Sequence, residues 1–164
     1  MNPFDDIKLK ILVFGPNPNV PTSPGFSTDL AKKRKDIRDA LISDGHQADF
    51  PEDLMRGSVD PVINNSYIWE DFLVRKYDMV VNLVCSYGTV TELSYFMDNE
   101  LALKAALFFC EDHTAGLAYQ QAKVIEAKGA NLHTYTYPND IAVCNLMKNV
   151  RQQVWVVRVC KFYS

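Results

Sequence analysis

The residues best suited to chemistry lie in one short segment, in which Gly88 and Thr89 are followed three positions later by Glu92. The segment follows an apolar run, Met79–Cys85, that has the length and β-branched content of a strand buried on both faces. Gly88 permits a tight turn and the close approach of a ligand to the backbone, and Thr89 can cap a new helix. Glu92 then falls in the first turn of that helix, with its carboxylate at the mouth of a sheet.

The same spacing also fits a purely structural role. Thr89-x-x-Glu92 satisfies the capping-box pattern, in which the glutamate bonds back to the N–H of the capping residue. The local pattern therefore leaves two roles open for Glu92, catalyst and helix cap.

Composition limits the kinds of protein that this chain can be. With 164 residues and 48% hydrophobic content, it is long enough for one domain over residues 1–164 and too short for two ordinary ones. The net charge of -3, from 17 basic and 20 acidic side chains, gives no general attraction to nucleic acid or anionic membrane. No segment reaches the roughly 18 uninterrupted apolar residues of a membrane span. The first ten residues, MNPFDDIKLK, do not resemble a signal peptide, so we expect a cytoplasmic protein.

The cysteine pattern points to no metal site. Cys85, Cys110, Cys144 and Cys160 lie far apart in apolar contexts, with neither CxxC nor histidine spacing for zinc. We predict four reduced thiols, no bound metal and no cofactor.

Alternating apolar and amphipathic segments predict the fold. Strands are expected at Leu9–Phe14, His46–Phe50, Met79–Cys85, Ala105–Cys110 and Leu132–Tyr137. Helices are expected over Ser27–Ser43, Tyr67–Arg75, Thr89–Lys104, Ala115–Lys128 and from Asp140 onward, whereas the polar stretch from Pro51 to Asn65 has no assigned element. This alternation predicts a three-layer, doubly wound α/β domain of flavodoxin-like type, with a five-stranded parallel sheet in the order 2-1-3-4-5.

This topology brings two loops together. Ligands of such sheets bind beyond the carboxyl ends of the strands, where the winding reverses between the first and third strands. The Gly15-Pro16 loop and Ser86–Glu92 both lie there. The first loop lacks the GxxxxGK[ST] motif, and its prolines remove N–H donors that a phosphate cradle needs. Arg34, four residues beyond Leu30 on the following helix, is the member of a basic run that we expect to face the sheet.

Several short motifs together resemble a known group of proteins. Phe14-Gly15-Pro16, a helix with Arg34 and Ile37, Asp44-Gly45-His46 and above all Gly88-Thr89-x-x-Glu92 are similar to those of the nucleoside 2-deoxyribosyltransferase-like group and its TIR-domain relatives. The resemblance covers roughly Leu9 to Leu107. In that group, the carboxylate that matches Glu92 attacks the anomeric carbon of a nucleoside or stabilises the cationic sugar as the glycosidic bond breaks.

The resemblance implies an N-glycosidase-type hydrolase or transferase that takes a small nucleoside or nucleotide, NAD among the options, and needs no metal. Glu92 would be the catalytic anion. The other residues assigned to substrate binding are Ser86 and Thr89 for ribose hydroxyls, Tyr87 or Phe96 for stacking on the base, Gly15, Pro16 and Asn17 around the phosphate or sugar together with Gly88, and His113 after the fourth strand. A homo-oligomer is compatible with this assignment.

Two departures from the group support an alternative function. The transferases carry an acidic residue just before the Gly-Thr pair, where this chain has Ser86-Tyr87, and a small-residue pattern where it has Leu93–Phe96. The missing acid argues less against N-glycoside cleavage than against base transfer. It is also what a non-catalytic nucleotide-binding or signalling module would show. Such a module would be TIR-like, or similar to LOG-type nucleotide phosphoribohydrolases, and would act in a bacterial defence or toxin–antitoxin system.

Overall fold

A five-stranded, all-parallel sheet forms the centre of the computed structural model, which describes residues 2–19, 25–56, 66–85, 91–142 and 145–164. The strand order is β2-β1-β3-β4-β5, as predicted. The strands are β1 (Lys10–Phe14), β2 (Gln47–Asp49), β3 (Met79–Val84), β4 (Ala105–Cys110) and β5 (Asn131–Tyr135). All four neighbouring pairs are parallel, so the carboxyl ends of the strands share one edge of the sheet.

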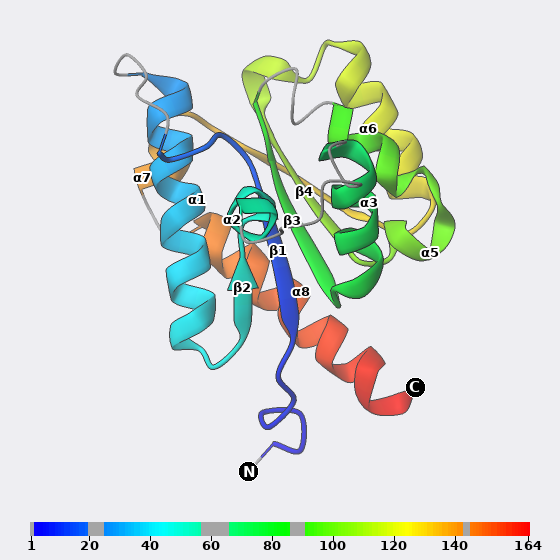
Figure 1. The fold of residues 1–164 in the computed structure, drawn as a ribbon. Coiled ribbons are helices and arrows are strands. Elements are labelled where there is room, and N and C mark those ends of the chain that lie inside the picture. Colours follow the sequence, from blue (N-terminus) through cyan, green and yellow to red (C-terminus); the bar gives the residue numbers. More distant parts are fainter. Residues whose placement is uncertain (1, 20–24, 57–65, 86–90, 143–144) are drawn as a thin grey trace.

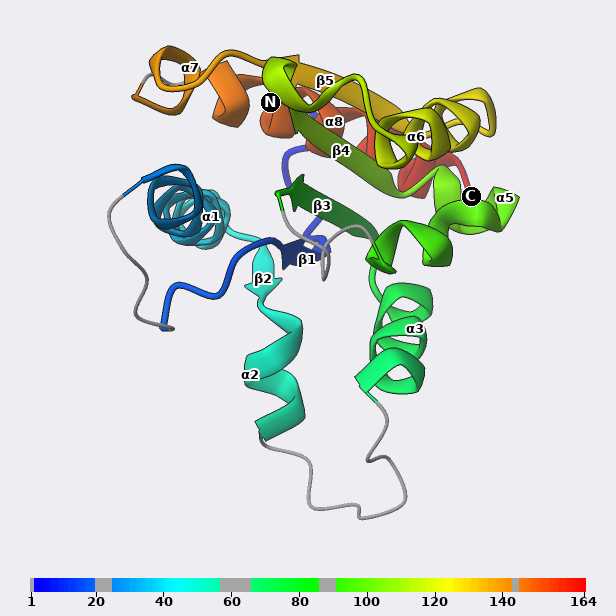
Figure 2. The ribbon, with the colours of Figure 1, turned by 90° about the horizontal axis from the view of Figure 1, so that it is seen from above.

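Helices cover both faces of this sheet (Figures 1 and 2). The described helices are α1 (Phe26–Ser43), α2 (Pro51–Arg56), α3 (Ser66–Lys76), α5 (Asn99–Ala102), α6 (Leu117–Ala127), α7 (Asn139–Ala142) and α8 (Asn145–Tyr163), with 3-10 helices η1 (Glu92–Met97) and η2 (Glu111–His113). In Figure 2, α1, α7 and α8 lie on one side of the sheet, and α3, α5 and α6 lie on the other. The fold is therefore the predicted three-layer, flavodoxin-like arrangement.

The alternation of side chains along β1 explains why there are two cores. Ile11 and Val13 point to the face that packs on α1 and α8, whereas Leu12 and Phe14 point to the face that packs on α3, η1, α5 and α6. All four side chains are buried. Helices on both faces of a parallel sheet make its strands apolar throughout, which is the pattern that the sequence shows.

The single helix predicted over Thr89–Lys104 is wrong, because the chain forms η1 and α5 instead. Asp98 separates them with an extended backbone, φ −72° and ψ 129°. Its carboxylate accepts the N–H of Glu100 at 2.9 Å, which is the bond of a helix N-cap. Local capping by an aspartate therefore prevails over the helical spacing of the apolar residues.

A second departure is α2, in the stretch for which no element was predicted. Pro51 opens it, Glu52 and Asp53 lie in its first turn, and Arg56 lies in its last turn. A proline at the first position, acids at the amino end and a base at the carboxyl end all favour a short helix.

Among the described residues, Cys85, Cys110 and Cys160 are reduced and form no disulfide, and Cys144 lies outside the described residues. None of the helices in the described ranges has both the length and the apolar character that are needed to cross a membrane.

Candidate functional site at the carboxyl ends of β1 and β3

A buried arginine organises the carboxyl edge of the sheet. Arg34 lies on the face of α1 that carries Leu30, Ile37 and Leu41, and only 1% of it is exposed. Its Nε and Nη2 donate to the carbonyl oxygen of Val13, at 2.9 and 2.7 Å. The prediction that Arg34 faces the sheet is confirmed.

Glu52, on the first turn of α2, pairs with this arginine. Two parallel hydrogen bonds join them, from Nη1 of Arg34 to Oε1 at 2.5 Å and from Nη2 to Oε2 at 2.8 Å. The guanidinium also lies 4.1 Å from the centroid of the Phe50 ring. Fork-on-fork geometry of this kind is the strongest arginine–carboxylate arrangement. Both carboxylate oxygens of Glu52 are therefore bound to Arg34.

The Gly15-Pro16 loop closes over the same arginine. The carbonyl oxygen of Pro16 accepts a hydrogen bond from Nη1 of Arg34 at 3.2 Å. Gly15 has φ +154°, and a Cβ atom there would lie 3.0 Å from Cδ of Arg34 and 3.3 Å from Cβ of Leu83. The loop approaches the arginine so closely because residue 15 has no side chain.

Glu92 lies at this edge with an unusual carboxyl group. It is the first residue of η1, and its Oε2 atom is buried with no hydrogen-bond partner among the described residues. Burial, with smaller contributions from Glu70 and Glu52, raises the pKa of Glu92 to about 9 against the opposing effect of Arg34. A carboxyl group with a pKa in this range is protonated at neutral pH.

Glu70 is a second carboxylate that the sequence reasoning missed. It lies on α3, and its Oε2 accepts a hydrogen bond from the hydroxyl of Tyr95 at 2.8 Å. Burial raises the pKa of Glu70, and the bond from Tyr95 opposes that shift. One signal was available: Glu70 is three and four residues before Leu73 and Val74, which are buried, so it shares the inward face of the helix.

Three of the residues predicted to bind substrate make contacts within the protein. Phe96 is 0% exposed and packs in the core beside α3 and α6. Oδ1 of Asn17 accepts the N–H of Asn19 at 2.9 Å in a local turn. His113 is exposed on η2, where its ring packs edge-on against Phe26 with the centroids 5.3 Å apart.

The remaining predicted residues are Ser86, Tyr87, Gly88 and Thr89, which lie outside the described residues. The structure thus brings together Gly15, Pro16 and Glu92 from the predicted set, and adds Arg34, Glu52 and Glu70 to them.

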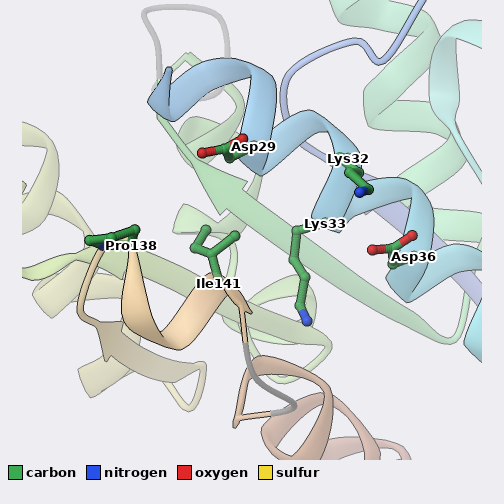
Figure 3. Close-up of a pocket in the computed structure, with 6 residues that line it drawn as sticks. All are labelled: Asp29, Lys32, Lys33, Asp36, Pro138 and Ile141. Atoms are coloured by element: carbon green, nitrogen blue, oxygen red, sulfur yellow. The ribbon is translucent and has the colours of Figure 1, made fainter. Parts of the chain in front are cut away.

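A separate hollow of about 350 Å³ lies between α1 and α7 (Figure 3). Asp29, Lys32, Lys33 and Asp36 of α1 line one side of it, and Pro138 and Ile141 line the other. Asp29 already accepts a hydrogen bond from the hydroxyl of Tyr137 at 2.6 Å. Because its charges are balanced and exposed, this hollow offers less to a specific ligand than the buried carboxyl groups do.

Metal binding has no support in the part of the chain that the structure describes. No group of three or more His, Cys, Asp or Glu side chains there is arranged to hold a metal ion. The carboxylates near Arg34 are better described as an acidic environment around one arginine.

Comparison with known proteins identifies no family for this chain. The sequence matches no protein-family model, and no curated protein matches it. The geometry of the site therefore carries the functional argument.

This arrangement of carboxyl groups favours the binding or formation of a positively charged group beside them. Three carboxyl groups lie around one guanidinium, and both oxygens of Glu52 are bound to it, so Glu70 and Glu92 would have little compensation from Arg34 when they ionise. Buried carboxylates stabilise a cation that develops next to them, because little water is present to screen them. A protonated carboxyl group can also donate its proton to a departing group.

Proposed function

We propose that this protein cleaves the N-glycosidic bond of a nucleoside or nucleotide, with Glu92 as the carboxylate at the anomeric carbon. The observation that carries the proposal is the buried, unpartnered Oε2 of Glu92 at the carboxyl edge of β1 and β3. Burying a polar atom without a partner costs stability, and a catalytic role is one reason for a structure to retain such an atom.

In the proposed reaction, the C1′–N bond breaks and its electron pair leaves with the base. The sugar becomes an oxocarbenium-like cation, which Glu92 either stabilises or traps as a covalent ester. Attack by water then gives hydrolysis, and attack by a second base gives transfer. The departing base takes up one proton from water, and Glu92, whose pKa burial raises to about 9, gives its own proton to water before it acts as an anion.

Glu70 supplies the second acid in this proposal. The transferase pattern has an acidic residue before the Gly-Thr pair, where this chain has Ser86-Tyr87. Glu70 lies on α3, close enough to Glu92 to raise the pKa of that carboxyl group. An ionised Glu70 would add a negative charge that stabilises the cationic sugar as the bond breaks.

The alternative is a nucleotide-binding or signalling module that cuts nothing. Burial raises the pKa of Glu92 to about 9, which favours this alternative because a neutral carboxyl group is not a nucleophile. In that case Thr89 and Glu92 would have only the capping role that their spacing also predicts.

Replacement of Glu92 by glutamine separates these functions. Purified protein is incubated with NAD and a panel of nucleosides, and free base is quantified by chromatography. The proposal expects Glu92→Gln to fold and to lose at least about a thousandfold in rate, which corresponds to ~4 kcal/mol of transition-state stabilisation. Glu126→Gln, on the exposed surface of α6, is the matched control and should keep full activity.

Full activity in a folded Glu92→Gln protein would end the proposed mechanism. A wild-type protein that cleaves nothing, and that binds a nucleotide equally well with or without the Glu92 charge, would establish the binding module instead.

A further inference from the structure

Arg34, the cation at the candidate site, has no N–H donor left for a ligand. A guanidinium has five N–H donors. In Arg34, Nε and Nη2 donate to Val13, Nη1 donates to Pro16, and each Nη donates to Glu52. These bonds account for all five donors, so an incoming phosphate finds none of them free.

Arg38 does not fill this gap. It lies over the same Phe50 ring, with 4.2 Å to the centroid, but pairs with Asp39 at 3.0 Å and with Asp53 at 3.7 Å. The segments 20–24, 57–65 and 86–90 contain no lysine, arginine or histidine. A phosphate at this edge would therefore obtain from neither Arg34 nor Arg38 the side-chain charge that phosphate sites in proteins ordinarily provide.

The acidic side chains, in contrast, outnumber the one guanidinium that lies among them. The ion pair of Arg34 and Glu52 is neutral as a unit, and Glu70 and Glu92 stand outside it. Oε2 of Glu92 is buried without a donor among the described residues. A ligand that brings positive charge would meet an acceptor that the protein itself leaves unused.

We propose that the Glu92 site selects a nucleoside whose base carries a positive charge and which has no phosphate group. This inference rests on the proposed function and narrows its substrate class. The reaction needs the anion of Glu92, whereas the pKa of this group favours the protonated form at neutral pH. A positively charged base beside Glu92 would lower that pKa and release the anion. In chemical terms, such a base is already a good leaving group, since the bond's electron pair neutralises it as it departs.

Methylated adenosines provide a matched test. N1-methyladenosine is protonated and therefore a cation at neutral pH, whereas N6-methyladenosine carries the same methyl group on another nitrogen and is uncharged. The 5′-monophosphate of N1-methyladenosine adds the phosphate. Titration calorimetry measures the affinity of each ligand, and chromatography of the released base measures kcat/KM.

We expect N1-methyladenosine to bind roughly thirtyfold more tightly than either of the other two, which is the effect of one uncompensated charge at about 8 Å in a partly screened site. Glu70→Gln, which keeps an acceptor for the Tyr95 hydroxyl, should reduce this preference severalfold, and Glu126→Gln should leave it unchanged. Circular dichroism verifies that both variants are folded.

The results of this experiment distinguish a failure of the charge selectivity from a failure of the proposed glycosidase function. If the protein cleaves nucleosides but prefers the uncharged isomer or the phosphate, the inference is overturned and the glycosidase proposal stands. If the cationic nucleoside binds preferentially and is not cleaved, the charge selectivity is supported and the glycosidase proposal fails. Absence of binding by all three ligands would overturn the inference.

Discussion

Arg34 and Glu52 form a two-bond ion pair that links α1 to α2 at the carboxyl edge of the sheet. Arg34 is 1% exposed and Glu52 is 22% exposed, so the arginine depends on this carboxylate and on two backbone carbonyls for its solvation. Because buried charges are tolerated only when they are paired, the two residues are coupled in stability. The same coupling leaves Glu70 and Glu92 without a cation of their own.

Loss of the arginine should be far more damaging than loss of a surface arginine. We expect Arg34→Met to lower the free energy of unfolding by about 3–5 kcal/mol, because Glu52 is left unpaired. The matched control, Arg151→Met, breaks an exposed pair with Asp44 and should cost less than about 1 kcal/mol. Urea unfolding of both variants measures the difference. Equal losses in the two variants would mean that the buried pair contributes no more than a surface one.

The sheet and its order could be predicted because burial on both faces leaves a strong apolar signal in each strand. The inward position of Arg34 could also be predicted, because its spacing from Leu30 places both on one face of α1. These features depend on local periodicity, which a single sequence displays.

The rest of the site depends on contacts between distant segments. Glu52 and Arg34 are paired although 18 positions separate them, and Tyr95 bonds to Glu70 from 25 positions away. Nothing in the sequence around Glu70 on α3 indicates that its carboxyl group will lie near that of Glu92 on η1. The break at Asp98 was missed for another reason, because one side-chain cap outweighed a favourable helical pattern.

Gly15→Ala should show how closely the first loop fits against the arginine. The new methyl group would lie 3.0 Å from Cδ of Arg34 and 3.3 Å from Cβ of Leu83, at a φ of +154°. We expect a loss of about 1–3 kcal/mol in stability. Thermal unfolding measures it, with Gly116→Ala as the control because no atom lies within 4 Å of a Cβ there. A Gly15→Ala protein as stable as the wild type would mean that the loop moves aside freely.

Tyr95→Phe should perturb Glu70 without removing its charge. The hydroxyl bond to Oε2 of Glu70, at 2.8 Å, holds the pKa of that carboxyl down against the effect of burial. Its removal should raise the pKa of Glu70 further and cost about 1 kcal/mol of stability. Carbon-13 NMR of labelled glutamate carboxyl groups follows the titration directly. An unchanged Glu70 titration would show that the bond does not control its charge.

Glu92→Gln should make the protein more stable while abolishing its activity. The folded-state pKa of Glu92 is about 9, above its ordinary value of 4.5, so between these values the folded protein binds more protons than the unfolded chain does. Stability is therefore lost as the pH rises through this range, and glutamine, which cannot ionise, avoids that loss. We expect a gain of about 1–3 kcal/mol at pH 7, increasing toward pH 9 and vanishing near pH 4. Urea unfolding at a series of pH values measures it, with Glu126→Gln as the control.

The capping-box alternative predicts a different result for the same substitution. A cap that needs only an acceptor would leave Glu92→Gln slightly less stable than the wild type, by about 0.5 kcal/mol, at every pH. A gain in stability that grows with pH would therefore show that the fold holds the carboxyl group of Glu92 in its protonated form. A small loss of stability that is the same at every pH would instead show that Glu92 caps the helix, because the substitution then removes no group whose ionisation the fold resists.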